Sequence, residues 1–295
     1  MQNILNLWNS VIRIIYPDYS PHPAPQRPFN IGTFLASDVA PTFKHSGNIG
    51  DIIFACALLK SFWKHTGKQT HLHLQTDVPV KYFFEHPLKN VMMNKTMADQ
   101  LLPALQMQPY IAHVTVGVTS PDNAIDLNAF RTLPIDLRCG LIQGWYQLCS
   151  DLWLDLFEPW IDAKTLPEYK NTIVLSRTLR LRSDYINYHF LSEYVDDLLY
   201  IGLPREITSF KAETRIDCRH MTVDSFDHFI NIVNSCRLFI GNQGFAYSVA
   251  EAVKCPRVLE SNSIAPNNYP LSSNGRIAIF QEQFESFVKA MLNNR

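Results

Sequence analysis

Short apolar runs typical of β-strands alternate with stretches of helical periodicity along most of the chain. The strand patterns fall at residues 42–44, 71–75, 111–116, 172–175, 198–203, 237–240 and 255–260. The helical patterns fall at residues 51–65, 97–107, 141–160, 184–197, 226–233, 245–254 and 281–292. Continuous apolar strands such as 172–175 are typical of parallel sheets, which are covered on both faces. Strands that alternate with helices in this way predict two doubly wound α/β sheets.

Prolines divide this pattern into three parts. Five prolines lie between residues 17 and 28, and Pro159 and Pro167 lie between the two α/β halves. We expect an N-terminal helix and a proline-rich arm over residues 1–28, a first Rossmann-like domain over 29–160 and a second over 165–295. The first segment lacks the basic start and the unbroken apolar core of a signal peptide, and we expect it to pack on the protein instead of on lipid.

Composition narrows the class of protein without naming a function. Of the 295 residues, 46% are hydrophobic and 18% are charged, and the net charge of −1 gives no general attraction to nucleic acid or to an anionic membrane. The six cysteines show no C-x-x-C spacing, so we expect a reduced, cytoplasmic protein. His71 and His73 share one face of a strand, but a third ligand at suitable spacing is absent, and we predict no metal site.

The stretch 43–51 joins a strand to a helix through a turn with two glycines, which is where open α/β sheets place ligands. The residues of this turn that we expect to shape a cleft are Lys44, His45, Ser46, Gly47, Asn48 and Gly50. The turn lacks the third glycine of a dinucleotide-binding fingerprint, and Asp51 at the helix start opposes a phosphate. Asp51 is then either an ordinary helix N-terminal acid, favoured by ~0.3–1 kcal/mol, or a carboxylate that takes a proton from a hydroxyl at the mouth of a cleft.

Two segments of the second half are better suited to phosphate. One is the strand-to-helix junction made of Gly241, Asn242, Gln243 and Gly244. The other is the basic loop after strand 172–175, which contains Ser176, Arg177, Thr178, Arg180 and Arg182. Helix N-terminal N–H groups and arginine forks both bind phosphate oxygens, although a solvated surface loop is an equal reading of the arginines.

Three further charged residues have both a structural and a functional interpretation. Asp126 and Arg131 follow a short strand; the sequence favours that they pair with each other or cap local structure, and the alternative is that they line the cleft for an acceptor. Glu260 ends a strand, where it could contact the ribose of a nucleotide or be a buried acid paired to an arginine.

Two motifs together resemble a known family. The sequence KHSGNIGDII at residues 44–53 resembles the N-terminal signature of the lipopolysaccharide heptosyltransferase-like glycosyltransferases, and FIGNQGFAYSVAEA at 239–252 resembles their C-terminal donor motif. The resemblance implies the GT-B fold, in which two Rossmann-like domains hold a sugar nucleotide in the cleft between them. It also implies inverting, metal-independent sugar transfer that needs no cofactor apart from the nucleotide sugar.

The resemblance implies roles for individual residues. Asp51 would be the general base, Lys44 and the 47–50 backbone would shape the acceptor side, and the basic loop with Gln243 and Gly244 would hold the donor phosphates. The family commonly has Asp at the position of Asn242 and His at the position of Tyr247, which implies that this chain holds the hydroxyl groups of the sugar differently.

The resemblance leaves the acceptor open among a saccharide, a glycolipid and a modified nucleobase. We predict no stable nucleic-acid or membrane partner. The alternatives are a sugar-nucleotide epimerase or hydrolase of the same fold and a non-catalytic nucleotide-sugar-binding protein.

Overall fold

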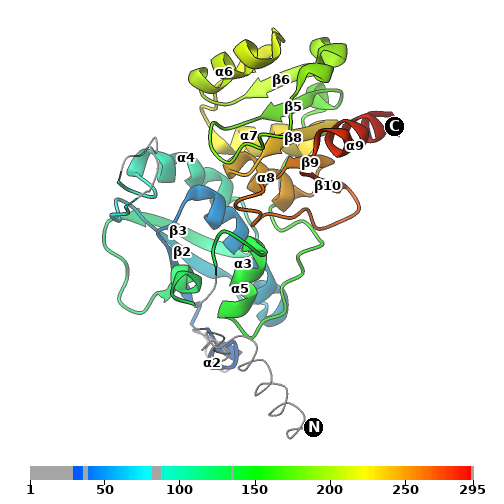
Figure 1. Ribbon diagram of the computed structural model, residues 1–295. Helices are drawn as coiled ribbons and strands as arrows, with labels where there is room; N and C mark the ends of the chain where they lie inside the picture. Colours follow the sequence, from blue (N-terminus) through cyan, green and yellow to red (C-terminus); the bar gives the residue numbers. More distant parts are fainter. Residues whose placement is uncertain (1–28, 36–38, 82–87, 89, 134–135, 294–295) are drawn as a thin grey trace, which may run out of the picture.

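The structure is a computed structural model that describes residues 29–35, 39–81, 88, 90–133 and 136–293 (Figure 1). The helix and proline-rich arm predicted for residues 1–28 lie outside the described residues. Two parallel sheets, one in each half of the chain, form two lobes. No helix of the described part is both long and apolar enough to cross a membrane.

The N-terminal half is built on a four-stranded parallel sheet with the order β3-β2-β1-β4. Its strands are β1 (Thr42–His45), β2 (Thr70–Gln75), β3 (Ile111–Gly117) and β4 (Ile125–Asp126). Its helices are α2 (Gly32–Leu35), α3 (Ile49–Thr66), α4 (Lys95–Gln106), the 3₁₀ helix η1 (Leu127–Thr132) and α5 (Ile142–Cys149). Because β1, β2 and β3 follow one another in one direction, right-handed crossovers place α3 and α4 on the same face of the sheet.

The C-terminal half contains a six-stranded parallel sheet with the order β10-β9-β8-β5-β6-β7. Its strands are β5 (Ile173–Ser176), β6 (Leu198–Ile201), β7 (Arg219–Met221), β8 (Leu238–Asn242), β9 (Arg257–Glu260) and β10 (Gly275–Ala278). Its helices are η2 (Pro167–Tyr169), η3 (His189–Asp197), α6 (Pro204–Thr214), α7 (Phe226–Ser235), α8 (Phe245–Val253) and α9 (Gln281–Asn293). Counted along the chain, this strand order is the 3-2-1-4-5-6 order of a Rossmann fold.

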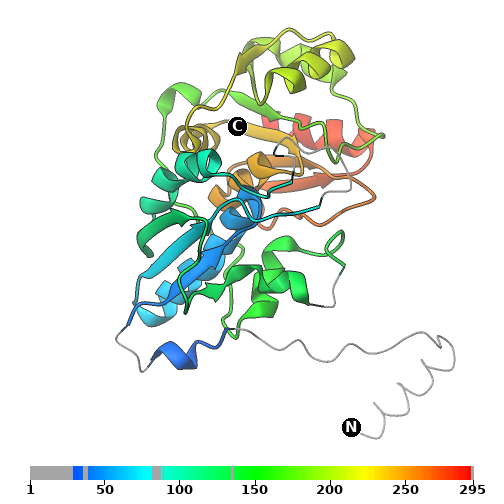
Figure 2. The same cartoon turned by 90° about the vertical axis from the view of Figure 1, so that its left-hand side faces the viewer.

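The two halves pack closely against each other. Helix α3 lies against α8, and α4 lies against α7, so that one hydrophobic cluster continues from the first half into the second (Figure 2). Gly50 in the first turn of α3 is so close to α8 that an added Cβ would lie 3.3 Å from the hydroxyl of Ser248. Trp160, in the connection between the halves, donates its indole N–H to the carbonyl of Ile53 in α3 and its backbone N–H to that of Ala252 in α8.

Two of the predicted helices differ from the structure. The pattern over 141–160 is helical only in α5; beyond it, the side chains of Ser150 and Gln147 accept the backbone N–H groups of Leu152 and Leu154, which removes them from helix formation.

The pattern over 184–197 forms the 3₁₀ helix η3 instead of an α-helix. Here the side chains of Ser183 and Asn187 accept the backbone N–H groups of Tyr185 and His189. The strands β7 and β10 were not predicted, because β7 has three residues and β10 four, too few to show an alternation of apolar and polar residues.

Candidate active site

The candidate site lies where the strand order reverses in both sheets. In the N-terminal sheet, β2 and β3 follow on one side of β1, and β4 lies on its other side. In the C-terminal sheet, β6 and β7 follow on one side of β5, and β8 lies on its other side. Ligands of open α/β sheets bind at the carboxyl ends of such strand pairs. All the predicted site residues lie at the carboxyl ends of β1, β4, β5 and β8 or in the segments that follow these strands, except Glu260, which ends β9 next to β8.

Asp51 lies in the first turn of α3, with its side chain mostly buried. Its carboxylate forms an ion pair with the guanidinium of Arg131, in η1. Burial raises the pKa of Asp51 above its usual value, while the positive charges of Arg131 and of Arg180 oppose that rise. Since Arg180 belongs to the C-terminal half, the Asp51 carboxylate lies within electrostatic reach of the basic loop.

A series of hydrogen bonds through His45 and Tyr146 supports the first turn of α3. The Nδ1 atom of His45 accepts the N–H of Gly47 at 3.0 Å, so a neutral ring carries its proton on Nε2 and donates it to the hydroxyl of Tyr146 at 3.0 Å. Tyr146, in α5, donates in turn to the backbone carbonyl of Asp51 at 2.8 Å. Burial, with a smaller contribution from Arg131, lowers the pKa of His45 to about 3, which keeps the ring neutral.

Asp126 and Arg131 each pair with a residue of the first junction. Asp126 lies 3.4 Å from the Nζ of Lys44 and also accepts the N–H of Asn128 at the start of η1. Of the two structural interpretations, pairing of Asp126 with Arg131 is wrong, because Arg131 pairs with Asp51, whereas capping of local structure holds for Asp126, the N-cap of η1. Register explains this: Asp126 and Lys44 are partners in adjacent strands, whereas Arg131 is more than one turn of η1 further along.

The small residues of the first junction pack tightly beneath Arg131. An added Cβ at Gly47 would lie 2.7 Å from the ring of His45 and 3.3 Å from the guanidinium of Arg131. The hydroxyl of Ser46 accepts the side-chain N–H of Asn128, and Asn48 is the N-cap of α3.

Asn242, at the end of β8, holds the basic loop in place. Its Oδ1 accepts the backbone N–H of Thr178, and its Nδ2 donates to the carbonyls of Thr178 and Arg180 at 3.2 and 2.6 Å. Asn242 is only 1% exposed, and its side-chain amide is hydrogen-bonded within the protein.

Arg177 and Glu260 lie together beneath this loop. Glu260 is fully buried and accepts two hydrogen bonds from the guanidinium of Arg177, one from the hydroxyl of Tyr188 and one from the N–H of Ser183. Ser176, the last residue of β5, is also buried. The arrangement is that of a buried acid paired to an arginine, and it ties the loop to the end of β9.

Arg182 is also engaged within the C-terminal half. Its Nε donates to the carbonyl of Thr178, and its Nη1 pairs with Glu213 of α6. Of the three arginines of the loop, Arg180 is the one whose charge acts on Asp51.

In the second junction Gly241 packs closely against the backbone of β5, whereas Gly244 leaves space around the start of α8. An added Cβ at Gly241 would lie 2.3 Å from the carbonyl oxygen of Ser176, its register partner in β5. Gly244 is the N-cap of α8, and a Cβ there would meet Thr178 at an ordinary 3.4 Å. The side chain of Gln243 points away from α8 and bonds the loop after β9, at Asn262, Ala265 and Asn267.

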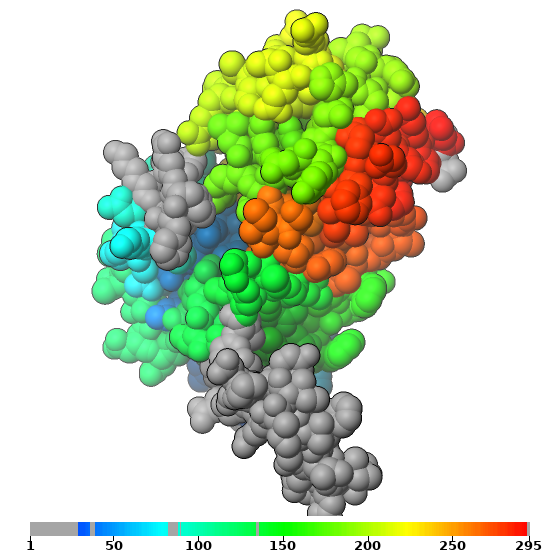
Figure 3. Space-filling model, viewed as in Figure 1, coloured from blue at the N-terminus to red at the C-terminus, as the bar shows by residue number. Residues whose placement is uncertain are grey.

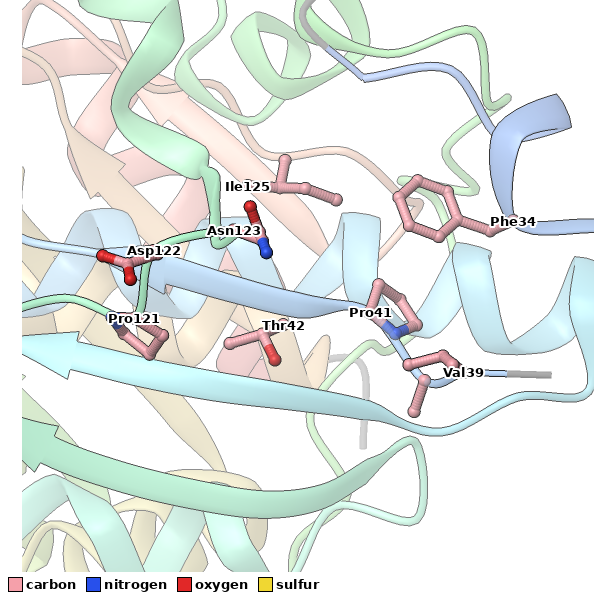
Figure 4. Close-up of a pocket in the computed structure, with 9 residues that line it drawn as sticks. Phe34, Val39, Pro41, Thr42, Pro121, Asp122, Asn123 and Ile125 are labelled. Atoms are coloured by element: carbon pink, nitrogen blue, oxygen red, sulfur yellow. The ribbon is translucent and has the colours of Figure 1, made fainter. Parts of the chain in front are cut away.

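A pocket of about 410 Å³ lies at the amino ends of β1 and β4, opposite to the carboxyl ends that form the candidate site. Phe34, Pro41, Thr42, Asp122 and Ile125 are among the residues that line it, at the beginning of β1 instead of its end (Figure 4). It therefore takes no part in the candidate site. Among the described residues, no three metal-ligating side chains gather, and His73 bonds the hydroxyl of Thr115 at 2.9 Å.

Tyr146 is the site residue that the sequence did not indicate. In the sequence it is one aromatic residue of an apolar helical face, and nothing in that pattern marks its hydroxyl as a partner of Asp51 and His45.

No protein-family model matches the sequence, and no curated protein matches it either. Three solved structures are similar over their whole lengths. The glycosyl transferase family 9 protein from Veillonella parvula DSM 2008 is 10% identical, with 88% of this chain and 100% of that chain covered and a TM-score of 0.55. The E. coli ADP-heptose LPS heptosyltransferase II is 11% identical, with 86% and 98% covered and a TM-score of 0.56. The E. coli heptosyltransferase WaaC with ADP is 8% identical, with 85% and 99% covered and a TM-score of 0.57.

This chain has the GT-B fold. The expectation of two Rossmann-like sheets, one in each half, is confirmed, and at such low identities the similarity speaks for the fold alone. In this GT-B chain Asp51 and the 241–244 junction lie at the carboxyl ends of β1 and β8, one in each half.

Proposed function

We propose that this chain is a glycosyltransferase that moves a sugar from a nucleoside diphosphate sugar to an acceptor hydroxyl, by direct displacement, with inversion and without a metal. The observation that carries the proposal is the position of Asp51. Its buried carboxylate lies at the end of β1, paired to Arg131 and within the electrostatic reach of Arg180 from the other half. The shared fold with solved glycosyltransferases supports the same conclusion.

Asp51 would act as the general base. It takes the proton of the acceptor hydroxyl while that oxygen bonds to the anomeric carbon of the donor, and the bond between this carbon and the diphosphate breaks. Burial raises the pKa of the carboxylate and so its basicity, while the ion pair with Arg131 opposes this rise and fixes the direction of the carboxylate.

The departing diphosphate would be stabilised by the C-terminal half. Its charge falls near Arg180 and near the first N–H groups of α8, which have no intrahelical partner and lie at the positive end of the helix dipole. Gly244 leaves the approach to these N–H groups open, since no side chain projects from the N-cap.

ADP-linked sugars are the first donors to test. The similar structures include a transferase named for ADP-heptose and one with ADP. The amide of Asn242 is occupied by the basic loop and Tyr247 is fully buried, so neither side chain would hold a sugar hydroxyl where the family commonly has Asp and His.

A mass-spectrometric screen tests this proposal. The full chain is incubated with ADP-, UDP-, GDP- and CMP-linked sugars, with and without pooled acceptor saccharides and glycolipids. Transfer to an acceptor that disappears in Asp51→Asn, with ADP affinity kept, supports a transferase with Asp51 as its base. Conversion of the donor without any acceptor would indicate an epimerase or hydrolase, and binding without conversion would indicate a nucleotide-sugar-binding protein.

A further inference from the structure

The loop between β9 and β10, residues 261–274, leaves the C-terminal sheet and contacts the N-terminal half. Figure 3 shows this segment, in orange, lying on the green segment that contains α5. Three hydrogen bonds cross between the halves here. The N–H of Ile142 donates to the carbonyl of Asn267 at 3.0 Å, the Nδ2 of Asn267 donates to the carbonyl of Leu137 at 2.8 Å, and the Nε2 of Gln143 donates to the carbonyl of Tyr269 at 3.0 Å.

Helix α5 depends on this contact for its N-terminal cap. The first N–H groups of a helix need partners from outside it, and the N-cap residue Leu141 has no side chain that can provide one. The carbonyl of Asn267 instead accepts the N–H of Ile142, the first residue of the helix. A helix of eight residues that contains Gly144 has little stability of its own, so its position is set by such tertiary contacts.

The same asparagine is bonded to the donor side. Its Oδ1 accepts from the Nε2 of Gln243 at 2.8 Å, in the junction after β8. Gln243 also accepts the N–H of Asn262, whose Nδ2 donates to the carbonyl of Arg182 in the basic loop at 2.7 Å. Both segments expected to hold the donor diphosphate are therefore hydrogen-bonded to the loop that caps α5.

At the other end of this connection, α5 reaches the carboxylate side of the cleft. Its residue Tyr146 donates to the backbone carbonyl of Asp51 at 2.8 Å. A continuous path thus runs from Gln243 through Asn267 and α5 to the first turn of α3.

We propose that Asn267 is a positioning residue that couples occupation of the donor junction to the placement of Asp51, by capping α5 from the opposite half. This inference rests on the proposed function, because it takes the junction at 241–244 to be the diphosphate site. Binding of a nucleoside diphosphate orders Gln243, Gln243 fixes Asn267, and Asn267 holds the helix that supports Asp51. A donor-free enzyme then has a less well placed base.

Hydrogen exchange of the full chain, with ADP as the probe, tests the coupling. In the wild-type protein, saturating ADP should slow exchange of the α5 amides. In Asn267→Ala the capping carbonyl remains, but the side-chain bonds to Leu137 and Gln243 that fix it are lost, so these amides should exchange about fivefold faster without ADP, and ADP should no longer slow them. Ile264→Ala, a change at an exposed side chain of the same loop, is the matched control and should behave like the wild type.

The variant should still bind ADP within about threefold of the wild-type affinity in calorimetry, because Asn267 is not among the residues proposed to hold the diphosphate. Where an acceptor is found, kcat should fall about tenfold with the donor KM little changed, and Asn267→Gln should restore part of it. A purely structural role for Asn267 would lower the melting temperature without removing the effect of ADP on α5.

The two proposals fail differently. If ADP binds and the α5 amides respond alike in wild type and Asn267→Ala, the coupling is wrong and the transferase proposal stands. If ADP, UDP and GDP all fail to bind the wild type, the proposed donor site is wrong and the coupling to it with it. Unchanged α5 exchange in the ligand-free variant would show that the side chain of Asn267 does not hold the capping carbonyl in place, and would overturn its positioning role by itself.

Discussion

The guanidinium of Arg131 forms an ion pair with the carboxylate of Asp51, across 80 residues of sequence. The pair joins the two turns that meet where the N-terminal sheet reverses its strand order, after β4 and after β1. It also sets two opposing influences on one carboxylate, because burial raises the pKa of Asp51 and the charge of Arg131 lowers it. The proposed general base is both partly desolvated and ion-paired, so its pKa can be moved in a known direction.

Replacing Arg131 by Gln should therefore shift the acid limb of the pH–rate profile upward. The rate falls as the pH falls through the pKa of the base, and loss of the positive charge raises that pKa, by about 1–2 units for a contact ion pair. The measurement is kcat/KM for the identified donor between pH 4 and 9. Arg138→Gln, which removes an exposed pair with Asp136, is the control and should leave the limb in place. An unmoved limb in Arg131→Gln would separate Asp51 from the rate-determining proton transfer.

His45 should make the protein less stable in mild acid. Its pKa is lowered from 6.5 to about 3 in the folded state, so below pH 6.5 the unfolded chain takes up a proton that the folded protein cannot. The free energy of unfolding then falls by up to ~1.4 kcal/mol per pH unit between pH 6.5 and 3, and this contribution is fully present only above pH 6.5.

Urea denaturation at pH 7, 6 and 5 measures this effect. The difference in unfolding free energy between wild type and His45→Gln should shrink as the pH falls, since glutamine takes up no proton. His65→Gln, at an exposed position of α3, should differ from the wild type by the same amount at each pH. A constant difference for His45→Gln would mean that the ring is protonated in the folded protein.

The sequence predicted the parts of this fold in which one physical signal dominates. Continuous apolar runs gave β5 and β8, and helical periodicity gave α3, α7 and α9, close to their observed ends. It failed where side chains compete for the backbone: Ser150, Ser183 and Asn187 accept N–H groups that a helix would need, and no periodicity reveals this. Of the aromatic residues at 150–160 only Trp160 is buried, between the halves, while Trp153 and Phe157 are exposed, so their spacing copies a helical pattern without being one.

For the site, strand-to-helix junctions could be found from glycines and flanking apolar runs, but the partners of each charge could not. Arg177 is the clearest example, because its position after a buried strand favoured a phosphate contact and the structure pairs it with Glu260. Which arginine of the loop acts on Asp51 depends on the packing of the two halves. The hydroxyl of Tyr146 reaches Asp51 only because α5 is placed from the opposite half.

Asn242→Asp introduces the residue that is common in the resembling family, but we expect it to disturb the basic loop instead of restoring a sugar contact. The Nδ2 of Asn242 donates to the carbonyls of Thr178 and Arg180, and a carboxylate oxygen in its place would face two carbonyl oxygens without a proton to share. We expect a loss of ~2–3 kcal/mol of unfolding free energy, measured by urea denaturation, and weaker ADP binding in calorimetry. Asn274→Asp, at an exposed side chain, controls for added charge. Retained stability together with tighter nucleotide-sugar binding would contradict this account.

The two glycines of the second junction should respond very differently to alanine. At Gly241 the new Cβ would lie 2.3 Å from the backbone carbonyl of Ser176, so β5 and β8 must separate at the point where the sheet reverses, and we expect a loss of about 3 kcal/mol or more in unfolding free energy. At Gly244 the Cβ would lie 3.4 Å from Thr178 and the backbone is extended, so Gly244→Ala should unfold within ~1 kcal/mol of the wild type. Its effect should fall on the ligand, with ADP affinity reduced about tenfold because a methyl group crowds the first N–H groups of α8. Urea denaturation and calorimetry of the two variants separate these effects. A stable Gly241→Ala would contradict the close backbone contact with Ser176, and a Gly244→Ala that binds ADP as the wild type does would place the diphosphate elsewhere.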